Sequence, residues 1–231
     1  MSIESDIERA SARPVCKRFT LLDAGREFWR HPTSWLIGGA LVLASVARIA
    51  AGDWQITDAL VVGVMVAAFP FLEWGIHVFI LHWRPRRVAG VTIDPPLARR
   101  HRQHHVDPRN MAFIPIPSKT LLLWILPLTV GIAVLAFPRL GLGLTYLVVS
   151  GVLGLCYEWS HCLIHSNYKP KTAAYRAIWR DHRLHHYKNE NYWFTTSTSG
   201  TADRVLRTYP DPATIRTSPT AKNLHAGLAD G

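Results

Sequence analysis

Four long apolar runs divide the chain. They lie near residues 34–51, 56–80, 120–137 and 140–160. Each run approaches or exceeds the roughly 20 residues that a helix needs to cross the hydrocarbon core of a bilayer. Four buried helices of a soluble core are the alternative, but the rest of the chain has too little amphipathic sequence to cover them. The pattern therefore predicts an all-α membrane protein with four transmembrane helices.

The basic residues lie almost entirely outside these runs. Of 26 Lys and Arg residues, six precede residue 34, eight lie between 84 and 119, and ten follow residue 165. Because Lys and Arg are enriched on the cytoplasmic side, both termini and the 84–119 loop are predicted to be cytoplasmic. The membrane would be the inner membrane of a bacterium or the endoplasmic reticulum of a eukaryote. The net charge of +10 follows from this bias and from attraction to anionic lipid, so no nucleic acid partner is needed.

The polar segments divide the chain into three parts. Residues 1–33 form a predicted cytosolic segment, in which 17–30 is either a short interfacial helix or a solvated lead-in. Residues 34–208 form the predicted membrane domain, with a cytosolic helical cap. Residues 209–231 have little apolar periodicity and are predicted to be a loosely ordered tail. No cleaved signal is expected, and three cysteines give no disulfide framework.

Ten of the twelve histidines fall in four clusters. Two histidine pairs end the second and fourth apolar runs, and HRQHH (101–105) and HRLHH (182–186) follow in polar sequence. Both halves of the chain thus repeat an apolar hairpin, Glu-Trp, a histidine pair and HRxHH. The clustered residues are His77, His82, His101, His104, His105, His161, His165, His182, His185 and His186.

The spacing of these histidines is that of metal ligands. Positions i, i+3 and i+4 share one face of a helix, so each HRxHH segment and the pair His161/His165 present imidazoles to one side. His77 and His82 are about 140° apart on an ideal α-helix, which predicts that one lies on an unwound end or approaches from a different side. Ten imidazoles fit two ions at about five each, and neutral imidazole suits iron, zinc, copper or nickel. The sequence contains no HExxH, phosphate-binding Gly-rich loop or GxSxG motif.

Read in order, the four clusters are HxxxxH, HxxHH, HxxxH and HxxHH, with a membrane hairpin between the second and third. This order resembles the signature of the fatty acid hydroxylase (sterol desaturase) superfamily of membrane di-iron enzymes, over roughly residues 56–208. The resemblance implies that the ten histidines ligate two iron ions, with zinc possible in the isolated protein. It also implies O₂-dependent oxidation of a C–H bond of a fatty acyl chain or related lipid. An external electron donor, a ferredoxin or small cytochrome, is then expected.

Several alternatives stay open at this stage. Within the superfamily, the substrate could be a sterol, a carotenoid or an aminolipid, and the reaction could be a desaturation. Outside it, the chain could be a metal transporter or a structural zinc protein of the membrane. The transporter is disfavoured because the ionisable residues lie only near the ends of the apolar runs.

Residues 189–208 (NENYWFTTSTSGTADRVLRT) resemble the segment that follows the last histidine cluster in the superfamily. The matching residues are Asn191, Tyr192, Asp203 and Thr208. Trp193 and Arg207 stand where glycine is usual, and Ala202 where tryptophan is common. The large Trp193 side chain is expected to narrow the path of the substrate.

Polar residues beside the clusters are candidates to orient the ligands. Glu73 and Glu158 lie in the last turn of an apolar run, where ionisable groups are costly and usually functional. We predict that they accept hydrogen bonds from ligand N–H groups; direct metal binding and a salt bridge with Arg84 or Arg102 are the alternatives. The further candidates for this role are Asn191, Asp203, Asp107 and Asp181.

Two arginines and two tryptophans near the clusters have other predicted roles. Arg102 and Arg183 point away from the shared histidine face, so we expect each to pair with a carboxylate or a lipid phosphate. Trp74 and Trp159 stand where aromatic residues anchor a helix at the membrane interface.

Overall fold

The computed structural model describes residues 19–225, which are mostly helical. Four of its helical segments are long and apolar enough to cross a membrane: Pro32–Ala51, Ile56–Leu81, Met111–Leu135 and Leu140–His165. The prediction of an all-α membrane protein with four spans is confirmed. The third segment begins earlier than its apolar run and the fourth ends later, because both continue into the part of the molecule that carries the histidines.

The elements follow the chain without long interruptions. In order they are α2 (Leu21–Phe28), α3 (Pro32–Ala51), α4 (Ile56–Ile76), the π-helix η1 (His77–Leu81), β1 (Arg86–Val88), β2 (Val91–Ile93), α5 (Pro96–Val106), the 3₁₀-helix η2 (Met111–Phe113), α6 (Ser118–Thr120), the π-helix η3 (Leu121–Ile125), α7 (Leu126–Leu135), α8 (Leu140–His165), α9 (Ala173–Tyr187) and α10 (Thr201–Val205).

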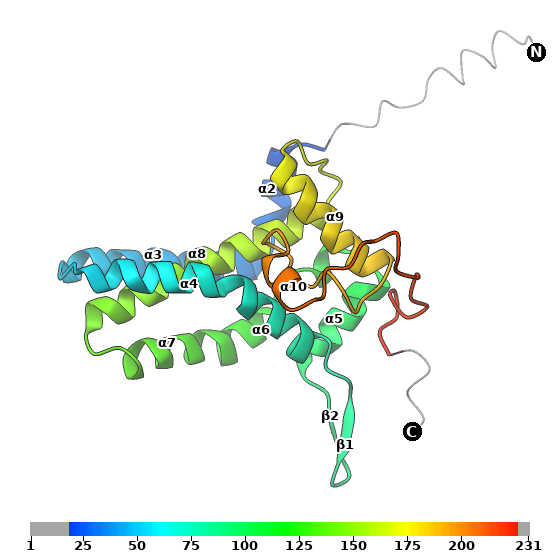
Figure 1. Ribbon diagram of the computed structural model, residues 1–231. Helices are drawn as coiled ribbons and strands as arrows, with labels where there is room; N and C mark the ends of the chain where they lie inside the picture. Colours follow the sequence, from blue (N-terminus) through cyan, green and yellow to red (C-terminus); the bar gives the residue numbers. More distant parts are fainter. Residues whose placement is uncertain (1–18, 226–231) are drawn as a thin grey trace, which may run out of the picture.

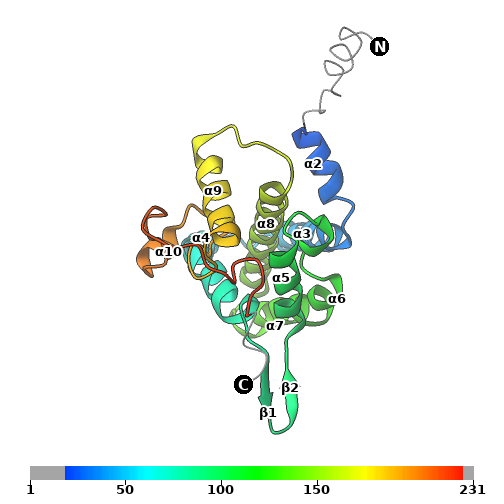
Figure 2. The same cartoon turned by 90° about the vertical axis from the view of Figure 1, so that its right-hand side faces the viewer.

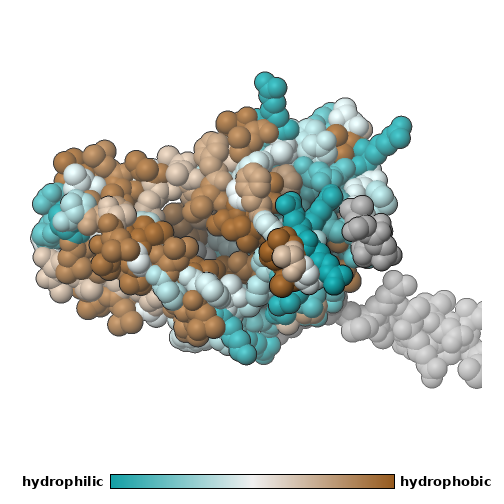
Figure 3. Space-filling view, turned by 90° about the horizontal axis from the view of Figure 1, so that it is seen from below, coloured by the Kyte–Doolittle hydropathy of each residue, from teal (hydrophilic) through white to brown (hydrophobic). Residues whose placement is uncertain are grey.

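Helix α8 is the centre of the bundle and packs against α3, α4 and α7. The spans run side by side toward one end of the molecule, and α5, α9 and α10 gather at the other end (Figures 1 and 2). Large apolar side chains such as Val42 and Leu43 point outward along the spans. The face in Figure 3 is accordingly brown over the spans and more hydrophilic at the opposite end. Lipid thus takes the place of a large buried core around these helices.

A buried ionic network joins the two hairpins at the end of the spans far from α5 and α9. The Arg48 guanidinium is 2% exposed and lies 3.1 Å from carboxylate oxygens of both Asp53 and Asp58. Its Nε donates to the Thr145 hydroxyl at 2.8 Å, and Arg139 pairs with the same two aspartates. These contacts neutralise charges that would otherwise be unpaired at a membrane-spanning segment.

The segment before the first span forms a short helix, one of the two sequence-based alternatives. Thr20 caps α2 by a reciprocal pair of hydrogen bonds with Asp23. Ala24 and Phe28 are buried, and the Phe28 ring meets the Trp159 ring edge to face at 5.3 Å. Trp159 therefore packs α2 against α8, a role other than the predicted interfacial anchor. Residues 1–18 of the predicted N-terminal segment lie outside the described residues.

Two features were not predicted. A two-stranded antiparallel hairpin, β1 and β2, projects from the chain after the second span (Figure 1). Residues 209–225, predicted as loosely ordered, instead pack against the rest of the protein: Ser218 and Thr220 bond to the buried Glu190, and Ala221 is itself buried. This stretch is built from turns, so hydrophobic periodicity does not detect it. The end of that predicted tail, 226–231, falls beyond the part that the structure describes.

Candidate metal centre

All ten clustered histidines meet where the spans join α5 and α9, and all except the half-buried His82 are buried. They form two groups of five, and within each group the potential ligand atoms lie within 4.8 Å of one another. The first cluster contains His77, His82, His101, His105 and His185. The second cluster contains His104, His161, His165, His182 and His186.

Each HRxHH segment contributes to both clusters. From α5, His101 and His105 enter the first cluster and His104 enters the second. From α9 the assignment is reversed: His182 and His186 join the second cluster and His185 joins the first. Each cluster thus receives a histidine pair from the end of a span, an i, i+4 pair from one cap helix and a single histidine from the other. The two halves of the chain are interlocked through the site.

A π-helical turn explains how His77 and His82 reach the same cluster. In η1 the backbone N–H of His82 donates to the carbonyl of His77 at 3.0 Å, an i→i+5 bond. A turn of this width brings residues five apart onto nearly the same face, and such turns are frequent at functional sites. The two rings lie with centroids 5.0 Å apart. His82 is the residue directly after η1 and has a non-helical backbone, with φ of −88° and ψ of 17°, which agrees with the predicted unwound end for one of the pair.

The ring nitrogens converge at distances suited to a shared ion. In the first cluster, Nε2 of His101 lies 3.1 Å from Nε2 of both His77 and His105. In the second cluster, Nε2 of His182 and Nε2 of His186 are 3.0 Å apart. Two imidazoles bound at right angles to one ion, with bonds of about 2.1 Å, place their nitrogens about 3 Å apart. The residues present therefore fit one metal ion in each cluster.

Burial keeps these imidazoles neutral. It holds the pKa of six cluster residues outside the spans well below the ordinary value, namely His82, His101, His104, His105, His182 and His186. Repulsion between neighbouring rings lowers these pKa values further. Burial also lowers the pKa of His185 to about 4. Neutral imidazole is the form that binds metal, so the clusters are in the required protonation state near pH 7.

Backbone carbonyls orient three rings of the first cluster. Each accepts a hydrogen bond from a ring Nδ1, which leaves Nε2 as the free ligand atom. The acceptors are the carbonyls of Phe194, Tyr192 and Ala221, at 2.5, 2.8 and 2.8 Å from the rings of His77, His185 and His105. All three carbonyls belong to the described residues after α9, 188–225, here called the C-terminal segment. Sequence reasoning missed them because any residue type can supply a carbonyl.

Glu73 supports the site indirectly, through the backbone of the C-terminal segment. Its buried carboxylate accepts hydrogen bonds from the backbone N–H groups of Thr196 and Ser197, both at 2.6 Å, which holds the C-terminal segment against α4. The Thr196 hydroxyl lies 3.3 Å from Nδ1 of His182. The prediction of a direct bond from Glu73 to a ligand ring is therefore wrong, because the ring meets a hydroxyl that the carboxylate positions.

Asp203 acts in a similar indirect way. Its fully buried carboxylate accepts the N–H groups of Phe194 and Thr195, at 2.9 and 3.0 Å, and the hydroxyls of Thr195 and Thr208. Phe194 is the residue whose carbonyl meets the ring of His77. Asp203 thus fixes the peptide that orients a ligand and does not touch the ligand.

Among residues 19–225, four other candidates make no hydrogen bond to a ligand ring: Glu158, Asn191, Asp107 and Asp181. Glu158 accepts the backbone N–H of Ile116 at 3.3 Å and so joins α8 to the start of the third span. Asn191 is exposed and bonds to Asn189 within its own loop. The backbone carbonyl of the next residue, Tyr192, accepts from the ring of His185, which is the role predicted for the Asn191 side chain.

The arginines and Trp74 have partners that partly match expectation. Arg102 pairs with the Asp94 carboxylate at 2.7 Å, which is the predicted kind of partner. Arg183 instead lies over two aromatic rings of its own helix. Trp74 donates its indole N–H to the Thr208 hydroxyl at 2.9 Å, so it holds the C-terminal segment and is not only an interfacial anchor.

The two positions where glycine was expected have left-handed backbone. Trp193 has φ of 54° and Arg207 has φ of 60°. Glycine adopts this conformation without strain, which gives the physical reason for the usual residue. Trp193 is 1% exposed and packs within the C-terminal segment. It is not among the residues that line the cavity beside the clusters, so the expected narrowing of the substrate path is not seen there.

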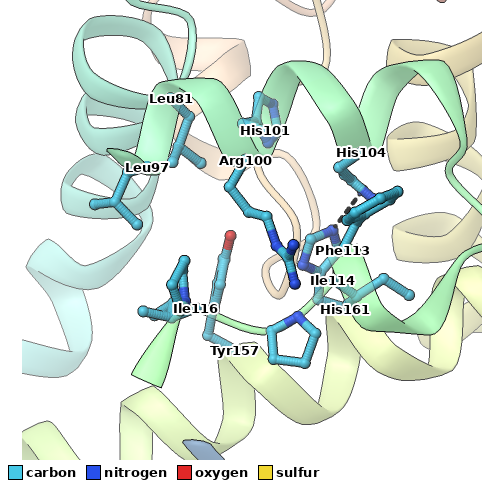
Figure 4. A pocket seen from close by; sticks show the side chains of 12 residues that line it. Leu81, Leu97, Arg100, His101, His104, Phe113, Ile114, Ile116, Tyr157 and His161 are labelled. Carbon is cyan, nitrogen blue, oxygen red and sulfur yellow. Dashed lines mark hydrogen bonds between the residues drawn. The ribbon is translucent and has the colours of Figure 1, made fainter. Parts of the chain in front are cut away.

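A small cavity of about 30 Å³ touches both clusters. His101 of the first cluster and His104 and His161 of the second contribute to its wall. The rest of the lining is mostly apolar and comes from α5, the residues around η2 and the end of the second span, with Tyr157 and Arg100 as its polar side chains (Figure 4). The arrangement can place an apolar group beside both metal positions.

Fold and site together define a class: helical membrane proteins with a histidine-rich metal centre at one end of their spans. Residues 62–208 match the family described as fatty acid hydroxylase, and the chain belongs to this family. The resemblance drawn from the four histidine clusters is thereby confirmed. The family is metal-dependent, and the protein is an oxidoreductase of the hydroxylase type.

Two known proteins are similar to this chain. Over 183 residues it is 26% identical to dihydroceramide fatty acyl 2-hydroxylase FAH2 of Arabidopsis thaliana, a match that covers 79% of this chain and 73% of that protein. Its fold is similar to a solved structure described as full-length scs7p, in which only the hydroxylase domain is visible. That similarity has a TM-score of 0.62 at 22% identity, over 83% of this chain and 69% of the other.

Proposed function

We propose that the protein is an O₂-dependent hydroxylase that holds one iron ion in each histidine cluster and oxidises a C–H bond of a fatty acyl chain. The observation that carries this proposal is the pair of five-histidine clusters, whose nitrogens converge on two adjacent points beside an apolar cavity. Five donors exceed the four of a structural zinc site, which favours iron over zinc as the native metal. With O₂ and two external electrons, two bound iron ions supply an oxidant stronger than any side chain.

The chain itself contributes binding, orientation and exclusion of water. In this proposal the ten histidines are the metal ligands and residues 34–208 form the hydroxylase domain. Buried carbonyls and Thr196 hold the rings, while Glu73 and Asp203 fix the segment that supplies these groups. The apolar cavity wall then receives a methylene group of the lipid.

A fatty acyl chain is the substrate that the comparisons favour. The plant relative carries the name of a dihydroceramide fatty acyl 2-hydroxylase, and the matched family is that of fatty acid hydroxylases. An acyl chain in a bilayer can also reach an apolar cavity at the end of the spans without crossing water. Sterols, carotenoids and aminolipids have no comparable support, and we propose hydroxylation over desaturation for the same reason.

The electron donor is proposed to dock on the basic end of the molecule. Arg84, Arg86 and Arg87 are exposed beside the site, and an acidic ferredoxin or small cytochrome would complement them. The excess of Lys and Arg at this end supports a cytoplasmic metal site and cytoplasmic termini. The membrane would be the bacterial inner membrane or the eukaryotic endoplasmic reticulum.

Metal counting with one ligand removed from each cluster tests the proposal. The protein is purified in detergent, its iron and zinc are quantified, and His104→Ala and His185→Ala are compared with the wild type. His31→Ala, which changes a histidine outside both clusters, is the matched control. We expect two ions per chain in the wild type and control, fewer in either cluster variant, and loss of hydroxylated lipid in both because the reaction needs both ions.

Mass spectrometry of lipids from cells with and without the protein gives the second readout. A gain of one oxygen atom on an acyl chain supports hydroxylation. One ion per wild-type chain, or product formation that survives either cluster variant, would contradict the two-ion proposal.

A further inference from the structure

The cavity beside the clusters contains one cationic side chain. Of the described residues that line it, most are apolar, and Arg100 alone carries a permanent positive charge. Figure 4 shows the Arg100 side chain extending from α5 into the space between Tyr157 on one side and Phe113 and His161 on the other. The Arg100 side chain is half-buried, and polar atoms on its buried side need hydrogen-bond partners.

The partners of Arg100 leave part of its guanidinium unused. Nη2 donates to the carbonyl of Ala112, and the guanidinium lies 4.7 Å from the centre of the Phe113 ring. Nε is buried and has no hydrogen-bond partner among the described residues. Among residues 19–225 no carboxylate pairs with Arg100, whereas Arg102, two residues later, pairs with Asp94. A buried donor without an acceptor is unfavourable, so the site gains stability when an acceptor enters.

The position of Arg100 on α5 relates this donor to the metal clusters. It immediately precedes His101 and lies four residues, about 6 Å along the helix axis, before His104. Arg100 also lines the same cavity as His101, His104 and His161, so a group held by its guanidinium lies beside both clusters. The cavity, of about 30 Å³, has room for a polar group the size of one or two water molecules but not for a whole acyl chain.

We infer that Arg100 binds the carboxylate or carbonyl oxygen of an acyl substrate and thereby selects the carbons nearest the acyl head for oxidation. The inference rests on the proposed function and adds a specificity-determining residue to it. With the head oxygen on Arg100, the first methylene groups lie against the histidine clusters and the rest of the chain extends toward lipid. A carboxylate gains charge and two parallel hydrogen bonds from the guanidinium, and a neutral carbonyl gains only hydrogen bonds.

Three probes of equal chain length test the inference on the full-length protein in detergent. Binding of radiolabelled palmitate, palmitamide and hexadecane to metal-free protein is measured for the wild type, Arg100→Leu and Arg99→Leu. Arg99 is an exposed arginine on the same helix and serves as the matched control. We expect Arg100→Leu to weaken palmitate binding about tenfold or more, the value of a charge-assisted hydrogen bond. In Arg100→Leu the affinity for palmitamide should fall less than that for palmitate, and the affinity for hexadecane should stay the same. Arg99→Leu should bind every probe as the wild type does.

If Arg100→Leu does not accumulate as folded protein, Arg100→Lys provides a second test of the inference. It retains the charge but loses the planar fork, so palmitate should bind several-fold more weakly and hexadecane should bind as before. In metal-loaded protein with a chemical or enzymatic reductant, the wild type should oxidise palmitate next to its carboxyl group, and the Arg100 variants should spread the hydroxyl along the chain.

The outcomes separate this inference from the proposed function. Equal palmitate affinities in Arg100→Leu and Arg99→Leu, or equal weakening of palmitate and hexadecane in an Arg100 variant, would overturn the role of Arg100. Arginine-dependent palmitate binding without any hydroxylated product would support the inference and contradict the proposed function. If the Arg100 variants hydroxylate palmitate at the same carbon as the wild type, the proposed function is supported and the role of Arg100 is contradicted.

Discussion

Replacing Asp203 by alanine is expected to loosen the first cluster and leave the second intact. The fully buried carboxylate accepts two backbone N–H groups and two hydroxyls. The hydroxyls can rotate toward other acceptors, but the N–H groups of Phe194 and Thr195 cannot. Each unpaired buried N–H destabilises the fold by about 1–3 kcal/mol, so the variant should lose about 4 kcal/mol of unfolding free energy.

The effect reaches the metal through a single peptide. Asp203 accepts the N–H of Thr195 at 3.0 Å, which belongs to the same peptide group as the carbonyl of Phe194, and this carbonyl accepts from Nδ1 of His77 at 2.5 Å. Changes to groups that orient a ligand lower metal affinity about 10- to 100-fold. Because Asp203 holds this peptide and does not touch His77 itself, the lower end of this range, about tenfold, is expected for the ion in the first cluster.

Competition with a chelator measures this difference. Wild-type protein in detergent should release its two ions in two phases, and His185→Ala identifies the phase that belongs to the first cluster. Asp203→Ala should shift that phase alone, and Asp203→Asn, which keeps one acceptor oxygen, should shift it less. The control is Asp211→Ala, an exposed aspartate of the same C-terminal segment. Equal weakening of both phases, or an equal effect in the control, would refute the proposed route from Asp203 to His77.

Two further predictions concern the spans. Arg48→Met removes a buried guanidinium and leaves Asp53 and Asp58 to share Arg139 alone. The one uncompensated charge should lower the unfolding free energy by about 3 kcal/mol. An unchanged denaturation midpoint in detergent would contradict the structural role of the network. Gly143→Ala places a methyl group against the backbone carbonyl of Ala133, so it should separate α7 from α8 and destabilise the protein by about 1–3 kcal/mol. Gly131→Ala, with no atom within 4 Å of the added methyl, is the control and should be neutral or stabilising in the same denaturation experiment.

Local patterns in the sequence were sufficient to predict the four spans and to select the ten histidines that the structure brings together. Hydropathy over about 20 residues is a property of each helix alone, so the four runs predicted the four spans. The i, i+3, i+4 spacing likewise predicted that each HRxHH segment presents its histidines together. What spacing could not predict is which cluster each histidine joins. His101 and His105 join the first cluster and His104 joins the second, and this division depends on how α5 packs against the other helices.

The groups that orient the histidines were harder to predict because their chemistry resides in the backbone. The carbonyls of Tyr192, Phe194 and Ala221 carry no signature in the sequence. The carboxylates of Glu73 and Asp203 were predicted to accept hydrogen bonds from ligand rings, but their partners include peptide N–H groups of the segment after α9. A residue can be identified from its unusual position while its contacts depend on where a distant segment folds.

The π-helical turn at His77–Leu81 has a consequence for how the two halves of the chain compare. The first histidine pair has four intervening residues and the corresponding pair, His161 and His165, has three. The wide turn accommodates the additional amino acid inside the helix, so both pairs deliver two rings to one side despite their unequal lengths. A one-residue change in length is thereby confined to a single turn, and the loop and helix α5 that follow need not shift their register. The centre can thus be symmetric in its donors although the chain that builds it is not symmetric in its spacing.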